Sequence, residues 1–507
     1  MQYQNPVISG FNPDPSICRV GEDFYLVTSS FEFFPGVPIY HSKNLINWEL
    51  INYCLTTDTQ LPLHTSKASG GIYAPTIRYH EGTFFMTTTN VSSKGNFIVH
   101  TDDIRGVWSE PAWVKQGGID PSLFWDEDGI CYFVSNGSDK KEGGKIFLCE
   151  INPFTGEMLT SSRLISEGCG GKHPEAPHIY KKDGWYYLML AEGGTEYGHM
   201  ETMQRSRDIW GPYEVCPHGP ILSHCNNCSD TLSTAIQATG HADLVEDQNG
   251  NWWMVCLAIR PLGPMLHNLG RETFLTPVVW NEDGWPEAGK AGRIRLEMEG
   301  NLPGPVPTAV NCNFKDDFDG DKLDLNWNFV RNPEKERYIL KDSSMMITGG
   351  DTTLSTPKGN PALIAVRQPE FCVEAETSMS GEVTAGQRSG LTAFYNWFTH
   401  YEIFITQKED GYYVCLGKHI GDIEVVTASQ KIDYKGSIRL KVESDKEWYT
   451  FFYKLDDEWM ELGRGLTAML CTETTYLMTY TGVYIGLFSE KGTASFADFE
   501  LKVKEEK

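Results

Sequence analysis

The sequence predicts an all-β protein, a five-bladed β-propeller followed by a concanavalin-like β-sandwich. One hairpin-like segment recurs five times in the first 300 residues, and after residue 314 apolar and polar residues alternate with period two. Helical periodicity is scarce along the whole chain of 507 residues. We therefore expect a propeller over 1–300, a linker over 301–313 and a sandwich over 314–507.

The repeated segment has the composition of a β-hairpin. Each copy begins with a variable residue, usually followed by proline, and continues as a short apolar strand, a tight Gly/Asp turn and an aromatic β-run. Further strands, such as PGVPIYHS, GNFIVHTD and GKIFLCEI, follow. The copies start 60, 46, 55 and 66 residues apart, at Asp14, Ala74, Asp120, Glu175 and His241. Units of about four antiparallel strands that keep one template favour a propeller over a row of independent sandwiches.

A change of composition separates the second domain. The Pro/Gly-rich stretch NLPGPVPTAVNCNF begins at Asn301. The strands after it alternate apolar and polar residues, as half-buried sandwich strands do, and include FCVEAETSMS, YEIFITQ, SIRLKVES, WYTFFYKL and ASFADFELKVK.

The first residues of the repeats indicate a catalytic centre. In a propeller, the first residue of each innermost strand points toward the central channel, so the five starting residues should surround one axis. Three of them, Asp14, Asp120 and Glu175, are acids. Acids are rarely buried unless they are paired or functional, and converging acids raise one another's pKa. A structural salt-bridged cluster is the alternative, with Arg271 in LGRETF as its counter-charge.

Glycoside hydrolysis requires two carboxyl groups on opposite sides of the scissile bond. One, kept protonated, donates to the leaving oxygen, and the other attacks or activates water. A third acid can tune and orient the proton donor. Glutamate is one methylene longer than aspartate, so Glu175 suits the donor role. The repeats alone therefore favour a glycosidase without assigning the three roles.

Seven motifs, in chain order, are NPDPSI, GGIYAPTIRYH, DPSLFWD, PEAPHIY, AEGGT, GHADLVE and LGRET. Together they resemble glycoside hydrolase family 43, in its members with a C-terminal β-sandwich, which are β-xylosidases and α-L-arabinofuranosidases. The resemblance covers essentially the whole chain and implies a five-bladed propeller and hydrolysis with inversion. It implies that Asp14 is the general base, Glu175 the general acid, and Asp120 the residue that raises the pKa of the acid and orients it. Inversion would place the carboxyl groups of Asp14 and Glu175 roughly 6.5–9.5 Å apart.

The resemblance also implies which residues bind the sugar. Arg271 matches an arginine that holds a substrate hydroxyl and one carboxylate, and Phe31 and Thr195 match substrate contacts. Tyr73 stands where tryptophan is common, and Tyr484 aligns with an aromatic residue of the sandwich that closes the pocket. Aromatic faces suit sugar C–H groups, although a role in the core is the alternative for each ring. A pocket closed in this way would hold one terminal sugar, which predicts an exo-acting enzyme.

Two positions depart from the family pattern, and a third position, His241, suggests a metal. Ala176 stands where glycine is usual, and this change and Tyr73 leave the preference between xylose and arabinofuranose open. His241 matches a central histidine that in some members lies by a calcium ion or a water, and calcium here would coordinate mainly water oxygens. A histidine satisfied by hydrogen bonds is the alternative. No cofactor is required, because two carboxyl groups and water complete the chemistry.

The expected activity is inverting, exo-acting release of terminal β-D-xylose from xylo-oligosaccharides. An α-L-arabinofuranosidase, or an enzyme with both activities, is the alternative. A non-catalytic carbohydrate-binding propeller belongs to another class; it would have lost one of the acids, and all three are present. The expected partner is a short xylo- or arabino-oligosaccharide, and the resemblance implies a homo-oligomer, a dimer or a tetramer.

The net charge and the cysteines indicate which partners are excluded and in which compartment we expect the protein. Lys and Arg number 43 against 68 Asp and Glu, and a net charge of −25 disfavours binding to nucleic acid or to anionic membranes. No run approaches the ~20 apolar residues of a membrane span. The thirteen cysteines have no regular spacing, and the first residues show no secretory signal, so we expect a cytoplasmic protein with free thiols.

Overall fold

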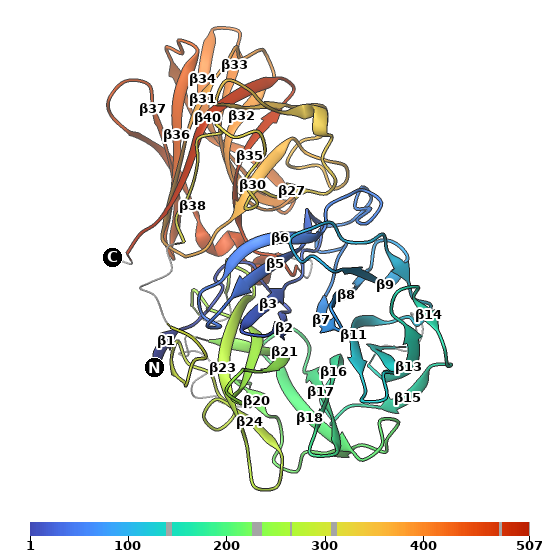
Figure 1. The fold of residues 1–507 in the computed structure, drawn as a ribbon. Coiled ribbons are helices and arrows are strands. Elements are labelled where there is room, and N and C mark those ends of the chain that lie inside the picture. The colour runs from blue at the N-terminus through green and yellow to red at the C-terminus, as the bar shows by residue number, and fades with distance from the viewer. Residues whose placement is uncertain (138–143, 226–235, 264–265, 306–311, 476–478, 506–507) are drawn as a thin grey trace.

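A computed structural model describes residues 1–505 apart from 138–143, 226–235, 264–265, 306–311 and 476–478. Figure 1 shows a ring of sheets, coloured blue to yellow-green, below a second body of orange and red strands. The predicted linker 301–313 lies partly outside the described residues. Helix in the described part is limited to three 3₁₀ turns, η1 (Lys335–Arg337), η2 (Thr467–Leu470) and η3 (Thr472–Thr474), and no helix there is long and apolar enough to cross a membrane.

Each of the five predicted repeats forms one antiparallel sheet. Its strands follow chain order, except that the fifth strand of the third and of the fourth sheet pairs with the third strand of that sheet. The first three sheets contain β2 (Ser16–Val20), β3 (Asp23–Val27), β5 (Gly36–Ser42) and β6 (Glu49–Leu55); β7 (Thr76–His80), β8 (Thr83–Asn90), β9 (Gly95–Thr101) and β10 (Ala112–Trp113); and β11 (Ile119–Trp125), β12 (Cys131–Asn136), β13 (Ile146–Asn152), β14 (Glu157–Met158) and β15 (Arg163–Ser166). The other two contain β16 (Glu175–Lys182), β17 (Trp185–Glu192), β18 (Met200–Ser206), β19 (Glu214–Val215) and β20 (Leu222–Ser223); and β21 (Gln237–Glu246), β22 (Trp252–Ile259), β23 (Glu272–Trp280) and β24 (Pro286–Ala288).

Tight two-residue turns join the first two strands of the second and fourth repeats, as the sequence predicts. Glu81–Gly82 joins β7 to β8, and Asp183–Gly184 joins β16 to β17. All four residues have positive φ, which is the backbone of a type I′ turn and follows the twist of the two strands.

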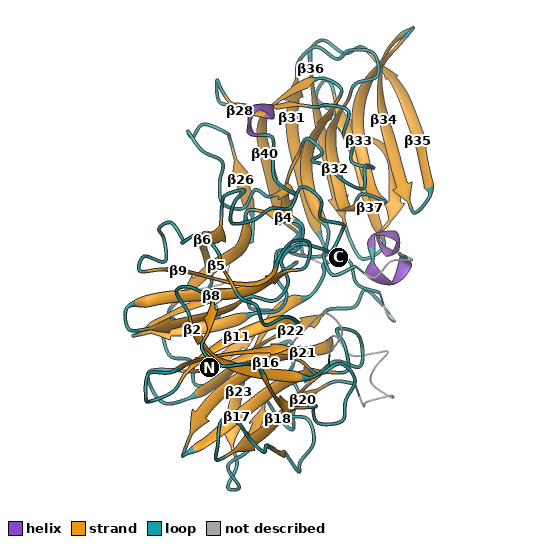
Figure 2. Ribbon diagram, turned by 90° about the vertical axis from the view of Figure 1, so that its right-hand side faces the viewer, coloured by secondary structure: helices purple, strands orange, loops and turns teal. Residues whose placement is uncertain are grey.

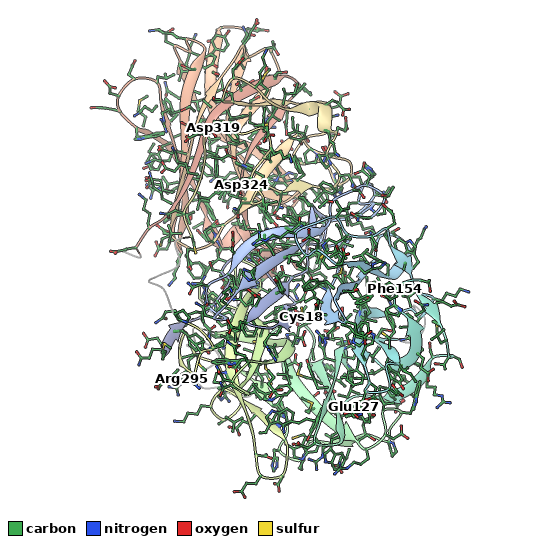
Figure 3. The ribbon with its side chains drawn as sticks, in the orientation of Figure 1. Cys18, Glu127, Phe154, Arg295, Asp319 and Asp324 are labelled. Atoms are coloured by element: carbon green, nitrogen blue, oxygen red, sulfur yellow. The ribbon has the colours of Figure 1, made fainter. Side chains whose placement is uncertain are left out.

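Apolar side chains fill the space between neighbouring sheets, and they close the ring. A separate apolar cluster lies between each neighbouring pair, and one of them joins Ile17 of the first sheet to Val255 of the fifth. The N-terminal strand β1 (Gln2–Gln4) pairs with β25 (Glu297–Glu299), at the other end of this domain. Figure 3 shows side chains filling the ring, with Phe154 and Arg295 at its outer edge.

The second domain is a sandwich of two antiparallel sheets around one apolar core (Figure 2). One sheet has the order β28 (Tyr338–Leu340), β29 (Met345–Thr348), β40 (Thr493–Val503), β31 (Val373–Ser380), β36 (Ser437–Ser444), β37 (Trp448–Lys454) and β38 (Met460–Leu466), with β26 (Phe314–Asp316) also paired to β40. The other has the order β30 (Leu363–Arg367), β39 (Tyr484–Glu490), β32 (Arg388–Asn396), β33 (Thr399–Lys408), β34 (Gly411–Ile420) and β35 (Ile423–Ile432).

The two domains share a packed interface. Strand β4 (Phe33–Phe34) of the ring pairs with β27 (Phe329–Val330) of the second domain. One apolar cluster contains Phe11 and Phe31 from the ring together with Phe394 from the sandwich. The Asn268 amide donates a hydrogen bond to the Tyr449 hydroxyl across the interface at 2.9 Å. This interface brings a segment of the sandwich to the end of the ring where the acids lie.

Candidate active site

The three predicted acids line a single cavity of about 90 Å³. Asp14 lies two residues before β2, Asp120 is the second residue of β11, and Glu175 opens β16. These are the innermost strands of the first, third and fourth sheets, as the repeats predict. The cavity is lined by Asp14, Phe31, Tyr73, Ala74, Ile119, Asp120, Glu175, Thr195, His241, Arg271 and Tyr480.

The backbone turns sharply where each innermost strand meets the cavity. Asp14, Asp120, Ala176 and His241 all have φ between +49° and +55°. The pairing register of β11 shifts between Ile119 and Ser122, and similar shifts occur at the starts of β16 and β21. Bulges of this kind re-aim side chains and are common beside active sites. They direct the acids toward the axis of the ring.

Asp14 is held as a carboxylate. Its Oδ1 accepts a hydrogen bond from Arg271 Nη1 at 2.8 Å, its Oδ2 accepts one from the Ser29 hydroxyl at 2.5 Å, and His241 Nδ1 lies 3.6 Å from Oδ1. Burial opposes ionisation, but the charge of Arg271, the neighbouring His241 and the Ser29 hydrogen bond together lower the pKa of Asp14. A buried carboxylate that stays ionised suits the base predicted at this position.

Glu175 has the opposite electrostatic environment. Burial, followed by the negative charge of Asp14, raises the pKa of Glu175 to about 7. Burial and the repulsion of Glu175 raise the pKa of Asp120 well above its ordinary value, and by reciprocity an ionised Asp120 would oppose ionisation of Glu175. The Ala176 N–H donates to Asp120 Oδ2 at 3.3 Å, which links Asp120 to the residue after Glu175. The different surroundings of the two residues thus favour a carboxylate at Asp14 and a protonated carboxyl group at Glu175 in one cavity.

Arg271 joins the acid cluster to the pocket wall. Besides Asp14, its Nη1 donates to Thr195 Oγ1 at 2.8 Å, and its Nη2 donates to the Tyr480 carbonyl at 3.4 Å. Thr195, Phe31 and Tyr73, three of the residues that the resemblance implies for the sugar, line the cavity with it.

Tyr484 does not line the cavity, unlike the other residues that the resemblance implies for the sugar. Tyr484 is fully buried between the domains, and its ring stacks on Phe33 with centroids 4.1 Å apart, outside the residues that line the cavity. Tyr480, four residues earlier, lines the cavity instead and stacks on Phe31 at 5.7 Å. At Gly482 an added Cβ would lie 2.2 Å from the Leu269 carbonyl oxygen, so glycine permits the close approach of this segment to the ring.

Among the described residues, the structure shows no protein ligand set for the predicted calcium ion near His241. Calcium takes six to eight oxygen ligands, whereas no group of three or more His, Cys, Asp or Glu side chains in the described part of the chain is arranged to hold a metal. Asp243, two residues further along β21, binds the guanidinium of Arg78 at 2.7 Å. The repeats did not predict this ion pair, although Asp243 shares the HADLVE segment with His241.

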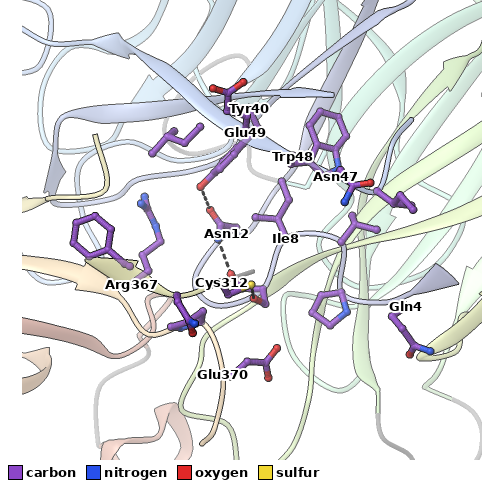
Figure 4. A pocket seen from close by; sticks show the side chains of 18 of the residues that line it. Gln4, Ile8, Asn12, Tyr40, Asn47, Trp48, Glu49, Cys312, Arg367 and Glu370 are labelled. Atoms are coloured by element: carbon purple, nitrogen blue, oxygen red, sulfur yellow. Dashed lines mark hydrogen bonds between the residues drawn. The ribbon is translucent and has the colours of Figure 1, made fainter. Parts of the chain in front are cut away.

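A larger groove of about 690 Å³ lies between the N-terminal segment, the first sheet and the second domain (Figure 4). Ile8, Trp48, Cys312 and Glu370 are among the side chains that line it. None of the three acids does, so the smaller cavity is the candidate active site.

Comparison with known proteins decides the family. Residues 3–286 match the model of the glycosyl hydrolases of family 43, and residues 315–502 match that of the β-xylosidase C-terminal concanavalin A-like domain. The chain belongs to glycoside hydrolase family 43. The chain is therefore a glycoside hydrolase, as the sequence predicts.

Relatives within family 43 match along nearly their whole length. The non-reducing end α-L-arabinofuranosidase BoGH43B of Bacteroides ovatus is 40% identical over 98% of this chain and 94% of its own. A xylosidase/arabinosidase of Butyrivibrio fibrisolvens is 36% identical over 99% of both chains. Among solved structures, a xylan β-1,4-xylosidase from Bacillus halodurans superposes with a TM-score of 0.92 at 32% identity, over 98% of this chain and 99% of its own.

Proposed function

We propose that this enzyme removes one terminal pentose from a short oligosaccharide with inversion, accepting β-D-xylosides and α-L-arabinofuranosides. The observation that carries the proposal is the opposite shift of two carboxyl groups in one cavity. The pKa of Asp14 is lowered, and that of Glu175 is raised to about 7. At neutral pH this pair offers one proton acceptor and one proton donor, which an inverting hydrolase needs.

In the proposed reaction, Asp14 takes a proton from water as the water oxygen bonds to the anomeric carbon. The glycosidic C–O bond breaks, and Glu175 gives its proton to the leaving oxygen. Arg271 holds Asp14 and is within reach of a sugar hydroxyl. Both carboxyl groups return to their starting states when the products leave and a proton passes back through solvent.

The size and walls of the cavity support exo action on a small sugar. The cavity is small, and Tyr480 of the second domain forms part of its wall. The Bacteroides ovatus relative is named an arabinofuranosidase and the Butyrivibrio relative a xylosidase/arabinosidase, which supports acceptance of both pentoses. The proposal therefore widens the expected β-xylosidase to an enzyme with two activities.

The proposal is tested on 4-nitrophenyl β-D-xylopyranoside and α-L-arabinofuranoside. We expect measurable kcat/KM on both for the wild type. On the corresponding disaccharide, whose sugar leaving group needs a proton, we expect a fall of about 10²–10⁴-fold for Glu175→Ala, because general acid catalysis contributes that much. Glu127→Ala, at an exposed site, is the control and should match the wild type. Survival of activity in Glu175→Ala would remove the assignment.

The proposed chemistry needs no metal. Two carboxyl groups and water balance the reaction. We expect kcat/KM to be unchanged after dialysis against EDTA; a loss that added calcium restores would contradict this. The cytoplasmic location and the dimer or tetramer stay predictions.

A further inference from the structure

A buried glutamate next to the general acid has no part in the chemistry above. Glu192 is the last residue of β17 and is fully buried. It follows Ala191, which lies opposite Glu175 in the pairing of β16 with β17. Glu192 also belongs to the AEGGT segment, whose threonine, Thr195, contacts Arg271.

Both carboxylate oxygens of Glu192 bind one loop. Oε1 accepts a hydrogen bond from the Cys169 N–H at 2.5 Å, and Oε2 accepts one from the Gly171 N–H at 2.7 Å. The next residues of this loop are fixed by the Gly193 N–H, which donates to the Lys172 carbonyl at 2.6 Å. The loop 168–174 leads directly into Glu175, so Glu192 fastens the segment that carries the acid.

The contact between the loop and Glu192 leaves no room for a side chain. A Cβ added at Gly171 would lie 2.4 Å from Glu192 Oε2, and one added at Gly168 would lie 2.7 Å from Oε1. The φ of Gly171 is not positive, so the backbone there would accept alanine. The added Cβ would meet Glu192 first, at Oε2 and at Cβ, and then the flexible end of Met200 at 2.8 Å.

The Glu175 carboxyl depends on its backbone for its position. Within the described residues, no group donates a hydrogen bond to this carboxyl, whereas Asp14 is held by Arg271 and Ser29. Asn136 Nδ2 donates to the Pro174 carbonyl at 2.6 Å, so the loop is fastened at both ends, by Glu192 and by Asn136.

We propose that Glu192 is a positioning residue for the general acid: by fastening loop 168–174 it aims Glu175 at the leaving oxygen. This inference rests on the proposed function. A glutamine at this position has one acceptor and one donor, so one backbone N–H would face an amide N–H. The loop would then shift, and proton donation would suffer more than binding of the sugar.

The test compares two leaving groups on the pentoside that the wild type prefers. A 2,4-dinitrophenyl group leaves without a proton, whereas a sugar leaving group needs one from Glu175. For Glu192→Gln we expect kcat/KM on the disaccharide to fall at least about tenfold more than on the dinitrophenyl glycoside, a part of the 10²–10⁴-fold that general acid catalysis supplies. A purely structural defect would lower both equally.

Two further variants make the result decisive. Glu490→Gln changes another buried glutamate, whose Oε1 accepts the Leu354 N–H in the sandwich, and should keep the wild-type ratio between the two substrates. Gly171→Ala disturbs the same contact from the loop side and should reproduce the Glu192→Gln ratio, including if Glu192→Gln does not fold. Equal losses on both substrates would overturn the inference. If the wild type were inactive on every pentoside, that result would instead contradict the proposed function.

Discussion

Ala176 occupies a backbone conformation that alanine rarely adopts. Its φ is +50°, and its N–H donates to Asp120 beside Glu175. A left-handed conformation costs an L-residue roughly 1–2 kcal/mol, whereas glycine adopts it freely. The glycine that the family resemblance implies at this position therefore has a physical reason.

We predict that Ala176→Gly stabilises the protein by about 1 kcal/mol, since the relief of strain exceeds the added chain entropy of glycine. Thermal unfolding with and without the substitution measures this. Ala242→Gly, on β21 where φ is not positive, is the matched control and should lower the unfolding temperature. A lower unfolding temperature for Ala176→Gly would contradict the assigned strain.

The activity should follow the ionisation of two residues. Glu175 donates a proton only while it holds one, so kcat/KM should fall as pH rises through about 7, the raised pKa of this residue. Asp14 must be ionised, and because its pKa is lowered, the loss on the acid side should begin only below the ordinary aspartate range. A pH profile of kcat/KM tests both limbs, and a profile still flat at pH 9 would contradict the role of Glu175.

At the scale of the strands, one buried acid connects four of the five sheets. Asp243 of β21 accepts hydrogen bonds from Ser16 at 2.6 Å, Arg78 at 2.7 Å and Tyr180 at 2.6 Å. Arg78 also donates to His178 Nδ1 at 2.8 Å, and burial lowers the pKa of that imidazole to about 3, so it stays neutral. This cluster connects the innermost strands of four sheets.

Asp243→Asn should destabilise the protein by about 3–5 kcal/mol, because it leaves the Arg78 charge buried without a counter-charge. Burial opposes ionisation, but Arg78 outweighs it and holds the pKa of Asp243 far below its ordinary value. The stability that Asp243 supplies is therefore complete above the ordinary aspartate pKa and is lost as pH falls through the lowered one. Unfolding midpoints at several pH values measure this, and an unchanged midpoint for Asp243→Asn would contradict it.

The sheets and the acids were predictable because they follow one local template. Asp14, Asp120 and Glu175 occupy the same place in their repeats, and each hairpin turn is determined by residues that are adjacent in the sequence. The ion pair of Asp243 with Arg78 was not predictable, because it joins different sheets and depends on how far the side chains reach across the channel. The register shift at the start of β21 hides it further, since period two no longer gives the direction of each side chain.

At the scale of the whole molecule, the second domain completes the cavity. The aromatic side chain of Tyr480 lines the cavity, and its carbonyl accepts a hydrogen bond from Arg271. Its N–H donates to Ser69 Oγ of the first domain at 2.9 Å. Tyr484 lies on β39 in the shared apolar cluster. The sequence could not distinguish these two tyrosines, because they stand in one short segment and only the docking of the domains decides which one lines the cavity.

The two tyrosines should therefore respond differently to replacement. We expect Tyr480→Ala to raise KM about tenfold or more, because the ring contributes a wall of the sugar site, with a smaller effect on unfolding. Tyr484→Ala should cost about 3–5 kcal/mol of stability, as the loss of a large buried ring does. Tyr484→Phe is the control for the latter and should be nearly neutral, because the hydroxyl has no partner among the described residues. Steady-state kinetics and thermal unfolding of the three variants decide the matter, and a raised KM for Tyr484→Phe would contradict this division.

The central claim is that Asp14 activates water while Glu175 protonates the leaving oxygen. The most direct test follows hydrolysis of an aryl β-D-xyloside by proton NMR and records which anomer of xylose appears first. Water activated by Asp14 attacks from the face opposite the leaving group, so α-D-xylose should appear first and β-D-xylose later by mutarotation. Initial release of β-D-xylose would show a covalent intermediate and contradict the account.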